Sequence, residues 1–231
     1  MSEAPPDPRW PTLLSLSVHE LRTPMTVVSG YIRMLLKDRA GPLSEPQRKL
    51  LQEAEKSCGR LSELLSEASD LAQLEDGRVV VGRQQADVIE ALRAAVDRLP
   101  PLSDRTVEIH VDVESGAAPI HGDPTRLAQA LSAVVAALRR ELVTEDPLIV
   151  RERKRRIDDR VVYEIAIGDP ATIGAFDEAE GRALTVFDEW RGGCGLSLPV
   201  ARRVIAALGG QLSSTPDGRK TAALIRLPAL S

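Results

Sequence analysis

The first third of the chain carries two stripes of apolar residues that recur at alternating spacings of three and four positions. The first stripe comprises Leu14, Val18, Leu21, Met25, Val28, Ile32 and Leu35. The second stripe comprises Leu51, Ala54, Cys58, Leu61, Leu65, Ala68 and Ala72. This spacing predicts two helices with narrow coiled-coil seams, and each seam needs an apolar partner along its length.

A short break separates the two predicted helices. Residues 40–42 (Ala-Gly-Pro) end the first helix, and Ser44 with Gln47 three residues later predicts a capping box at the start of the second. Gly77 should end the second helix. Two seam helices joined by so short a loop make an antiparallel hairpin, which a second copy usually completes as a four-helix bundle. We therefore expect a homodimer.

The pattern becomes mixed after residue 76, which predicts a domain boundary there. The proline-rich residues 1–11 predict a flexible lead-in, residues 12–76 the helical hairpin, and residues 77–231 a second domain. In the second domain we expect strands at residues 79–81, 105–113, 147–151, 161–167, 211–214 and 221–227, and helices at residues 86–99, 123–140 and 199–208. This mixture predicts an α/β sandwich.

Composition argues against several classes of function. The formal net charge is -4, from 30 basic and 34 acidic residues, so a nucleic-acid partner is not indicated. The basic run at residues 151–156 is interpreted as a solvated strand end or hairpin. No apolar run approaches the roughly 20 residues that span a bilayer, and no secretory signal is evident, so we expect a cytoplasmic protein without a membrane span. The three histidines have no metal-ligand spacing, so no metal site is expected.

His19 is the residue that most directly suggests chemistry. It follows Val18 of the first stripe, so its imidazole should stand on the flank of the hairpin, where a neutral ring nitrogen can attack a phosphoryl group. Glu20 can accept the proton from the other ring nitrogen. Thr23, one turn further on the same face, can orient a water or a phosphoryl oxygen. Considered without these neighbours, His19 is better explained as a solvated surface histidine.

The segment around His19 decides between these interpretations. Residues 17–26 (SVHELRTPMT) closely resemble the phosphoacceptor box of sensor histidine kinases. The resemblance implies that His19 is phosphorylated, that Glu20 assists as a base, and that Thr23 serves hydrolysis of a phosphorylated response regulator. It therefore implies two-component signal transduction, with a response-regulator receiver domain as partner.

The remainder of the chain is similar to the ATP-binding domain of the same family. Residues 122–131 resemble the opening of the helix that carries the family's asparagine box, but Ala133 and Ala137 stand where its two asparagines would. An alanine methyl group cannot coordinate Mg²⁺, which needs oxygen ligands. The usual anchor for the metal of Mg-ATP is therefore missing from the sequence.

Other motifs of the nucleotide site are kept unevenly. Asp169 stands where the family's aspartate binds adenine, although residues 170–173 replace the expected spaced glycines. A turn aspartate after a strand explains Asp169 equally well. Gly193, Gly195 and Leu196 resemble the phosphate-side loop, whose backbone amides favour anions. These four residues make up the nucleotide site that the resemblance implies.

Three functional interpretations remain open. The chain can be a kinase that binds ATP through altered ligands, a phosphotransfer protein whose His19 is loaded by a receiver aspartate or a partner kinase, or a non-catalytic dimeric pseudokinase that binds a response regulator or regulates a partner histidine kinase. Transfer from ATP relies on the cation, so Ala133 and Ala137 argue against autophosphorylation. We predict a protein histidine kinase or phosphotransferase by resemblance, whose His19 exchanges a phosphoryl group with a response-regulator aspartate.

Overall fold

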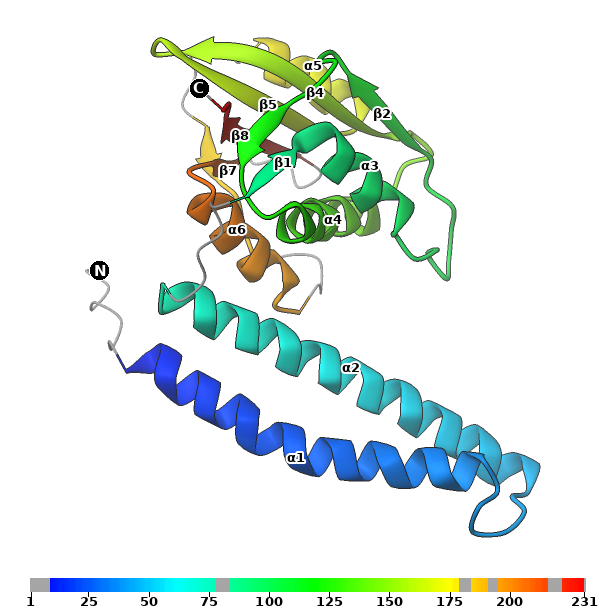
Figure 1. Ribbon diagram of the computed structural model, residues 1–231. Helices are drawn as coiled ribbons and strands as arrows, with labels where there is room; N and C mark the ends of the chain where they lie inside the picture. The colour runs from blue at the N-terminus through cyan, green and yellow to red at the C-terminus, as the bar shows by residue number, and fades with distance from the viewer. Residues whose placement is uncertain (1–8, 78–83, 179–183, 191–194, 216–221, 231) are drawn as a thin grey trace, which may run out of the picture. The chain divides into compact units, whose positions relative to one another are not determined.

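The computed structural model describes residues 9–77, 84–178, 184–190, 195–215 and 222–230. The chain divides into two compact units, Met1–Val79 and Val80–Ser231, which are described separately (Figure 1). Among the helices of the described residues, none is both long enough and apolar enough to cross a membrane.

The first unit is a hairpin of two long helices. α1 spans Trp10–Leu36 and α2 spans Glu45–Glu75, which confirms the helices predicted from the two stripes. The backbone nitrogen of Ser44 donates to Gln47 Oε1 at 2.9 Å, as the predicted capping box requires. After α2, Gly77 has a φ of 65°, a left-handed conformation that glycine adopts without steric penalty at helix ends.

The loop between the two helices is fixed by one arginine. Arg48 donates from Nη2 to both carboxylate oxygens of Asp38 at 2.9 Å. Its Nη1 donates to the carbonyl oxygen of Leu36 at 3.0 Å. These bonds satisfy a carbonyl at the end of α1 and tie the loop to the start of α2.

The seam of the hairpin is only partly covered. Its buried residues are Val18, Ile32, Cys58, Ala68 and Ala72. Leu21, Val28 and Leu61 belong to the same predicted stripes, yet they are 53%, 46% and 48% exposed. Because a hairpin gives each helix a single neighbouring helix, the far side of each stripe faces outward in one chain.

The second unit is an α/β sandwich on a six-stranded sheet, which confirms the predicted fold class. Its strands, in sheet order, are β2 (Ile109–Val113), β4 (Leu148–Ile157), β5 (Arg160–Gly168), β8 (Ala223–Pro228), β7 (Gln211–Ser214) and β6 (Thr185–Val186). β2 pairs in parallel with β4, and the other neighbouring strands are antiparallel. A separate ribbon joins β1 (Gln85–Asp87) to β3 (Pro119–His121).

The helices cover the two faces of the sheet unequally (Figure 1). Three lie on one face, namely α3 (Val88–Asp97), α4 (Pro124–Glu141) and α6 (Ser197–Ala207), whereas α5 (Pro170–Glu178) lies on the opposite face. The main core lies between the sheet and the three helices, where Ile165, Ile167 and Ile225 are fully buried. Burial of these side chains is the main driving force for this unit.

The starts of α3 and α4 are set by aspartate caps. Asp123 Oδ1 accepts from two amides in the first turn of α4, as the predicted helix start at residue 123 requires. The helix predicted at residues 86–99 begins instead at Val88, because Gln85–Asp87 pair with β3. The side chain of Asp87 then caps α3 through two amides.

Other predicted boundaries also need correction. The strand predicted at residues 105–113 begins at Ile109, and most of its residues are exposed because β2 is an edge strand. The basic run at residues 151–156 lies within β4, which forms a hairpin with β5. The segment after β5 forms α5, where no helix is predicted. The strand predicted at residues 79–81 lies outside the described residues.

Candidate functional site

His19 lies on the flank of α1. Val18, the residue before it, is buried in the seam at 4% exposure, whereas the side chain of His19 is 77% exposed. Successive residues of a helix are rotated by about 100° around its axis. This rotation carries the imidazole from the seam to the solvent, where a second protein can reach it.

The ring of His19 is oriented by its neighbour in sequence. His19 Nδ1 lies 3.4 Å from Glu20 Oε1. In the tautomer with its proton on Nδ1, this nitrogen donates to Glu20, and Nε2 keeps its lone pair. Both side chains are exposed, so the pair contributes little to stability. In that tautomer Glu20 Oε1 lies within reach of the Nδ1 proton, and the lone pair of Nε2 is left for a partner.

Thr23 lies one helical turn beyond His19 and is exposed on the same side of α1. The neighbouring hydroxyls of Ser17 and Thr26 donate to main-chain carbonyls one turn earlier, each at 2.9 Å. Within the part of the chain that the structure describes, the Thr23 hydroxyl has no hydrogen-bond partner. It is therefore available to orient a water or a phosphoryl oxygen near His19.

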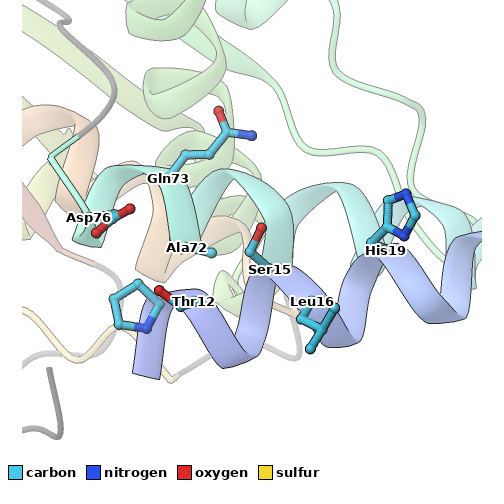
Figure 2. Close-up of a pocket in the computed structure, with 8 residues that line it drawn as sticks. Thr12, Ser15, Leu16, His19, Ala72, Gln73 and Asp76 are labelled. Atoms are coloured by element: carbon cyan, nitrogen blue, oxygen red, sulfur yellow. The ribbon is translucent and has the colours of Figure 1, made fainter. Parts of the chain in front are cut away.

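A groove of about 310 Å³ reaches the His19 ring between the start of α1 and the end of α2. Its lining comprises Pro11, Thr12, Ser15, Leu16 and His19 from α1, Ala72 and Gln73 from α2, and Asp76, the residue that caps the end of α2. Figure 2 shows Ser15 and His19 rising from the same side of α1, while Leu16 points to the other side. The hydroxyl and amide groups beside His19 give this end of the hairpin hydrogen-bonding capacity for a polar partner.

The residues predicted for the metal end of a nucleotide site lie in α4. Ala133 is partly buried, and Ala137 is fully buried at 0% exposure. Neither side chain carries an oxygen. Throughout the described residues, no group of three His, Cys, Asp or Glu side chains is arranged to hold a metal ion.

The residues predicted for the nucleotide itself are placed at helix starts. Asp169 precedes α5, and its Oδ1 accepts from Thr172 N at 2.7 Å. Gly195 has a φ of 64°, and Leu196 is the N-cap residue of α6. Gly193 lies outside the described residues. The cap at Asp169 corresponds to the turn aspartate that the sequence left as an alternative.

Sequence reasoning missed a buried ion-pair cluster beside α6. The carboxylate of Glu189 is only 7% exposed and accepts from Arg202 Nη1 at 2.9 Å and from Arg203 Nη1 at 2.8 Å. A carboxylate buried this deeply needs such partners. The sequence offered only the adjacent pair of arginines as a signal. Glu189 lies 13 residues before Arg202, so no local spacing links the carboxylate to them.

Comparison with known proteins places this geometry in a family. The model of the His Kinase A (phospho-acceptor) domain matches residues 12–77, which include His19. The signal transduction histidine-protein kinase BarA of Escherichia coli (strain K12) is 26% identical over 208 residues, covering 84% of this chain and 22% of BarA. Residues 12–77 belong to the His Kinase A (phospho-acceptor) domain family, and the chain is homologous to sensor histidine kinases.

Two further similarities extend over both units. The circadian input-output histidine kinase CikA of Synechococcus elongatus is 28% identical over 215 residues, covering 87% of this chain and 28% of CikA. The crystal structure of full-length ShkA in complex with AMPPNP has a TM-score of 0.64 and 25% identity, covering 95% of this chain and 45% of ShkA. The chain thus spans only 22% to 28% of the length of these two curated histidine kinases.

Proposed function

We propose that this member of the histidine kinase family carries a phosphoryl group on His19 and exchanges it with an aspartate of a response-regulator receiver domain. The observation that supports this most directly is the geometry of the ring, which is solvent-exposed and has Nδ1 directed to Glu20. The match of residues 12–77 to a phospho-acceptor domain supports the same role.

The proposed exchange needs no group beyond the two proteins and the metal that the receiver brings. Nε2 of His19 attacks the phosphorus of the receiver's acyl phosphate, and a P–N bond forms as the P–O bond to the receiver aspartate breaks. The aspartate leaves as a carboxylate with the bonding electron pair. The Nδ1 proton passes to Glu20 and then to water. The reverse sequence returns the phosphoryl group to the receiver.

Thr23 is proposed to act in the hydrolysis of a phosphorylated receiver. Its hydroxyl is exposed one turn from His19, and it has no partner in the described structure that competes for it. A hydroxyl in this position can orient a water toward an acyl phosphate docked at the His19 ring. The role comes from the family resemblance, which the geometry of α1 supports.

The hairpin is proposed to act as a homodimer. Leu21, Val28 and Leu61 remain about half exposed, although the seam pattern places them on faces that pack. Burying an apolar side chain contributes about 1.5–3 kcal/mol, and a second hairpin supplies the cover that one chain lacks. The stripes continue along both helices, which favours a four-helix bundle over a local contact.

The test is phosphoryl transfer from a loaded receiver. Each receiver domain encoded in the source genome is loaded with radiolabelled acetyl phosphate, freed of excess reagent and mixed with the purified full chain. We expect label on the wild-type chain that is lost in acid and kept in alkali, as a P–N bond requires, and no label on His19→Ala.

A second histidine provides the matched control. His110 is also exposed and lies beside a carboxylate, with Nε2 2.9 Å from Glu108 Oε1, but it lies on β2 and not on the hairpin. His110→Ala should keep the full label. Equal labelling of the wild type and His19→Ala, or loss of label in His110→Ala alone, would remove His19 from the proposed role.

A further inference from the structure

We propose that the α/β unit does not hold Mg-ATP, and that the phosphoryl group on His19 originates from an acyl phosphate of a receiver domain. This inference rests on the proposed function of His19 and adds the direction from which the phosphoryl group arrives. The solved structure of ShkA contains the nucleotide analogue AMPPNP, so nucleotide is the ligand whose fit must be tested. Three separate features of this chain argue against nucleotide binding.

The first feature is the path of the chain after β5. Ile173 of α5 is buried against Ala166 of β5 and Leu224 of β8, and Phe176 packs on the same cluster. Ala166 and Leu224 are register partners, and their neighbours Ile165 and Ile225 point to the other side of the sheet. α5 therefore lies on the face opposite α4 and α6 (Figure 1).

This path separates segments that a nucleotide would need together. In the family pattern, the residues after the aspartate, the asparagine helix and the phosphate-side loop contribute to one nucleotide site. In this chain the asparagine helix is α4, and the described residues that follow the phosphate-side loop form α6 on the same face, whereas α5 is packed on the other. One nucleotide cannot contact backbone on both faces of a sheet, because strands β5 and β8 lie between them.

The carboxylate that would bind adenine is also engaged. Asp169 Oδ1 accepts from Thr172 N at 2.7 Å, and the carbonyl of Asp169 accepts from Ile173 N at 3.0 Å. These bonds start α5, with Pro170 at its first position. These bonds fix the Asp169 carboxylate at the start of α5, so any adenine contact would have to be made from this capping position.

The second feature is the lack of metal ligands at Ala133 and Ala137 of α4. At Ala137 the helix surface is fully buried, so protein atoms fill the space in which a family asparagine would meet its ligand. Ala133 is partly accessible but offers only a methyl group. Mg²⁺ takes hard oxygen ligands and neutralises the charge on the phosphates during transfer from ATP. Neither function can be supplied from these two positions.

The third feature is the charge at α6. Arg202 and Arg203 would be the cations of this helix nearest in sequence to the phosphate-side loop, but both donate to the buried Glu189 carboxylate. An anionic triphosphate would have to compete with a carboxylate already held inside the protein. Displacing Glu189 would leave a buried charge unpaired, which is costly.

The experiment measures binding and labelling with the same preparation of the full chain. Equilibrium dialysis with radiolabelled AMPPNP and Mg²⁺ is run in parallel on ShkA, whose structure holds this analogue. We expect saturable binding by ShkA and none by this chain up to about 1 mM ligand, the weak end of specific affinities. Saturable binding by this chain within tenfold of the ShkA affinity would overturn the proposal.

The labelling arm separates this inference from the proposed function. Wild-type chain and His19→Ala are each offered radiolabelled ATP with Mg²⁺, and separately the acyl-phosphate-loaded receivers. Label on wild type from the receiver but not from ATP supports both proposals. Label from ATP that His19→Ala lacks would overturn the inference and leave His19 as the acceptor. No label on His19 from either donor would overturn both the proposed function and the receiver as source.

Discussion

Replacing Ala137 with asparagine is expected to destabilise the α/β unit by about 2–6 kcal/mol, although it restores the family's residue type. Ala137 is fully buried in α4. Adding atoms to a packed core costs about 1–3 kcal/mol, and burying an amide without hydrogen-bond partners costs about 1–3 kcal/mol more. A domain of this kind has a total stability of about 5–15 kcal/mol, so the effect is large.

Ala133→Asn is the matched control for this substitution. Ala133 lies one turn earlier on the same helix and is only partly buried. Its replacement should cost about 0.5–0.7 kcal/mol, because asparagine has a lower helix propensity than alanine. Because the same propensity cost applies at Ala137, the difference between the two variants isolates the effect of burial.

Native-state hydrogen exchange of α4 peptides, followed by mass spectrometry, reports the α/β unit separately from the hairpin. We expect α4 protection to fall strongly in Ala137→Asn and slightly in Ala133→Asn. If the two variants lose the same stability within about 0.5 kcal/mol, residue 137 is not tightly packed. If Mg-ATP restores the protection of α4 in Ala137→Asn through ligand linkage, position 137 faces a ligand. Either result would contradict the packing of Ala137 inferred above.

Three further results are expected. Glu20→Gln should slow phosphoryl transfer from a loaded receiver by about 10²-fold, since general-base assistance typically contributes about 10²–10⁴-fold, measured by quenched-flow labelling. Leu21→Glu should shift the chain from dimer to monomer in sedimentation velocity, because the charge would lie within the bundle. Tyr163→Phe should remove part of the stability loss above pH 10. Burial, then Glu152 and Asp87, raise the pKa of Tyr163 above 10.0, so its contribution is present below that pH and lost as pH rises further.

Each of these has its own contrary result, and the dimer prediction has a control variant. Gln52→Glu, on the exposed side of α2, should leave the dimer intact. An unchanged transfer rate in Glu20→Gln would mean that water alone takes the Nδ1 proton. A dimeric Leu21→Glu chain would place the interface elsewhere. The free energy of unfolding is measured with urea at pH 9 and pH 11 for wild type and Tyr163→Phe. An equal loss of stability in the two proteins would show that folding does not change the titration of Tyr163.

The hairpin could be predicted from sequence because its information is local. The stripe spacing, the Ser44 capping box and the glycine at residue 77 each specify structure within a few residues. The exposure of His19 follows from its place beside Val18 in the same pattern. The start of α4 at Asp123 was predicted for the same reason, since the apolar spacing that follows Asp123 is a local helix signal.

The features that the sequence did not reveal depend on distant partners. α5 begins with an Asp-Pro pair that resembles the start of α4, but the segment is short and its apolar residues are explained only by packing on Ala166 and Leu224. The burial of Glu189 requires two arginines on another element. In β2, three consecutive residues are exposed where the alternation predicts a half-buried strand, because only the tertiary fold places this strand at the sheet edge.

The most direct measurement is to map the phosphorylated residue after the wild-type chain has been incubated with an acyl-phosphate-loaded receiver and Mg²⁺, without nucleotide. Peptides are prepared at alkaline pH to preserve the P–N bond and sequenced by electron-transfer fragmentation. We predict a single phosphohistidine, at His19 on the exposed flank of α1. A phosphoryl group on any other residue, or phosphorylation of His19 that appears only when ATP is added, would contradict it.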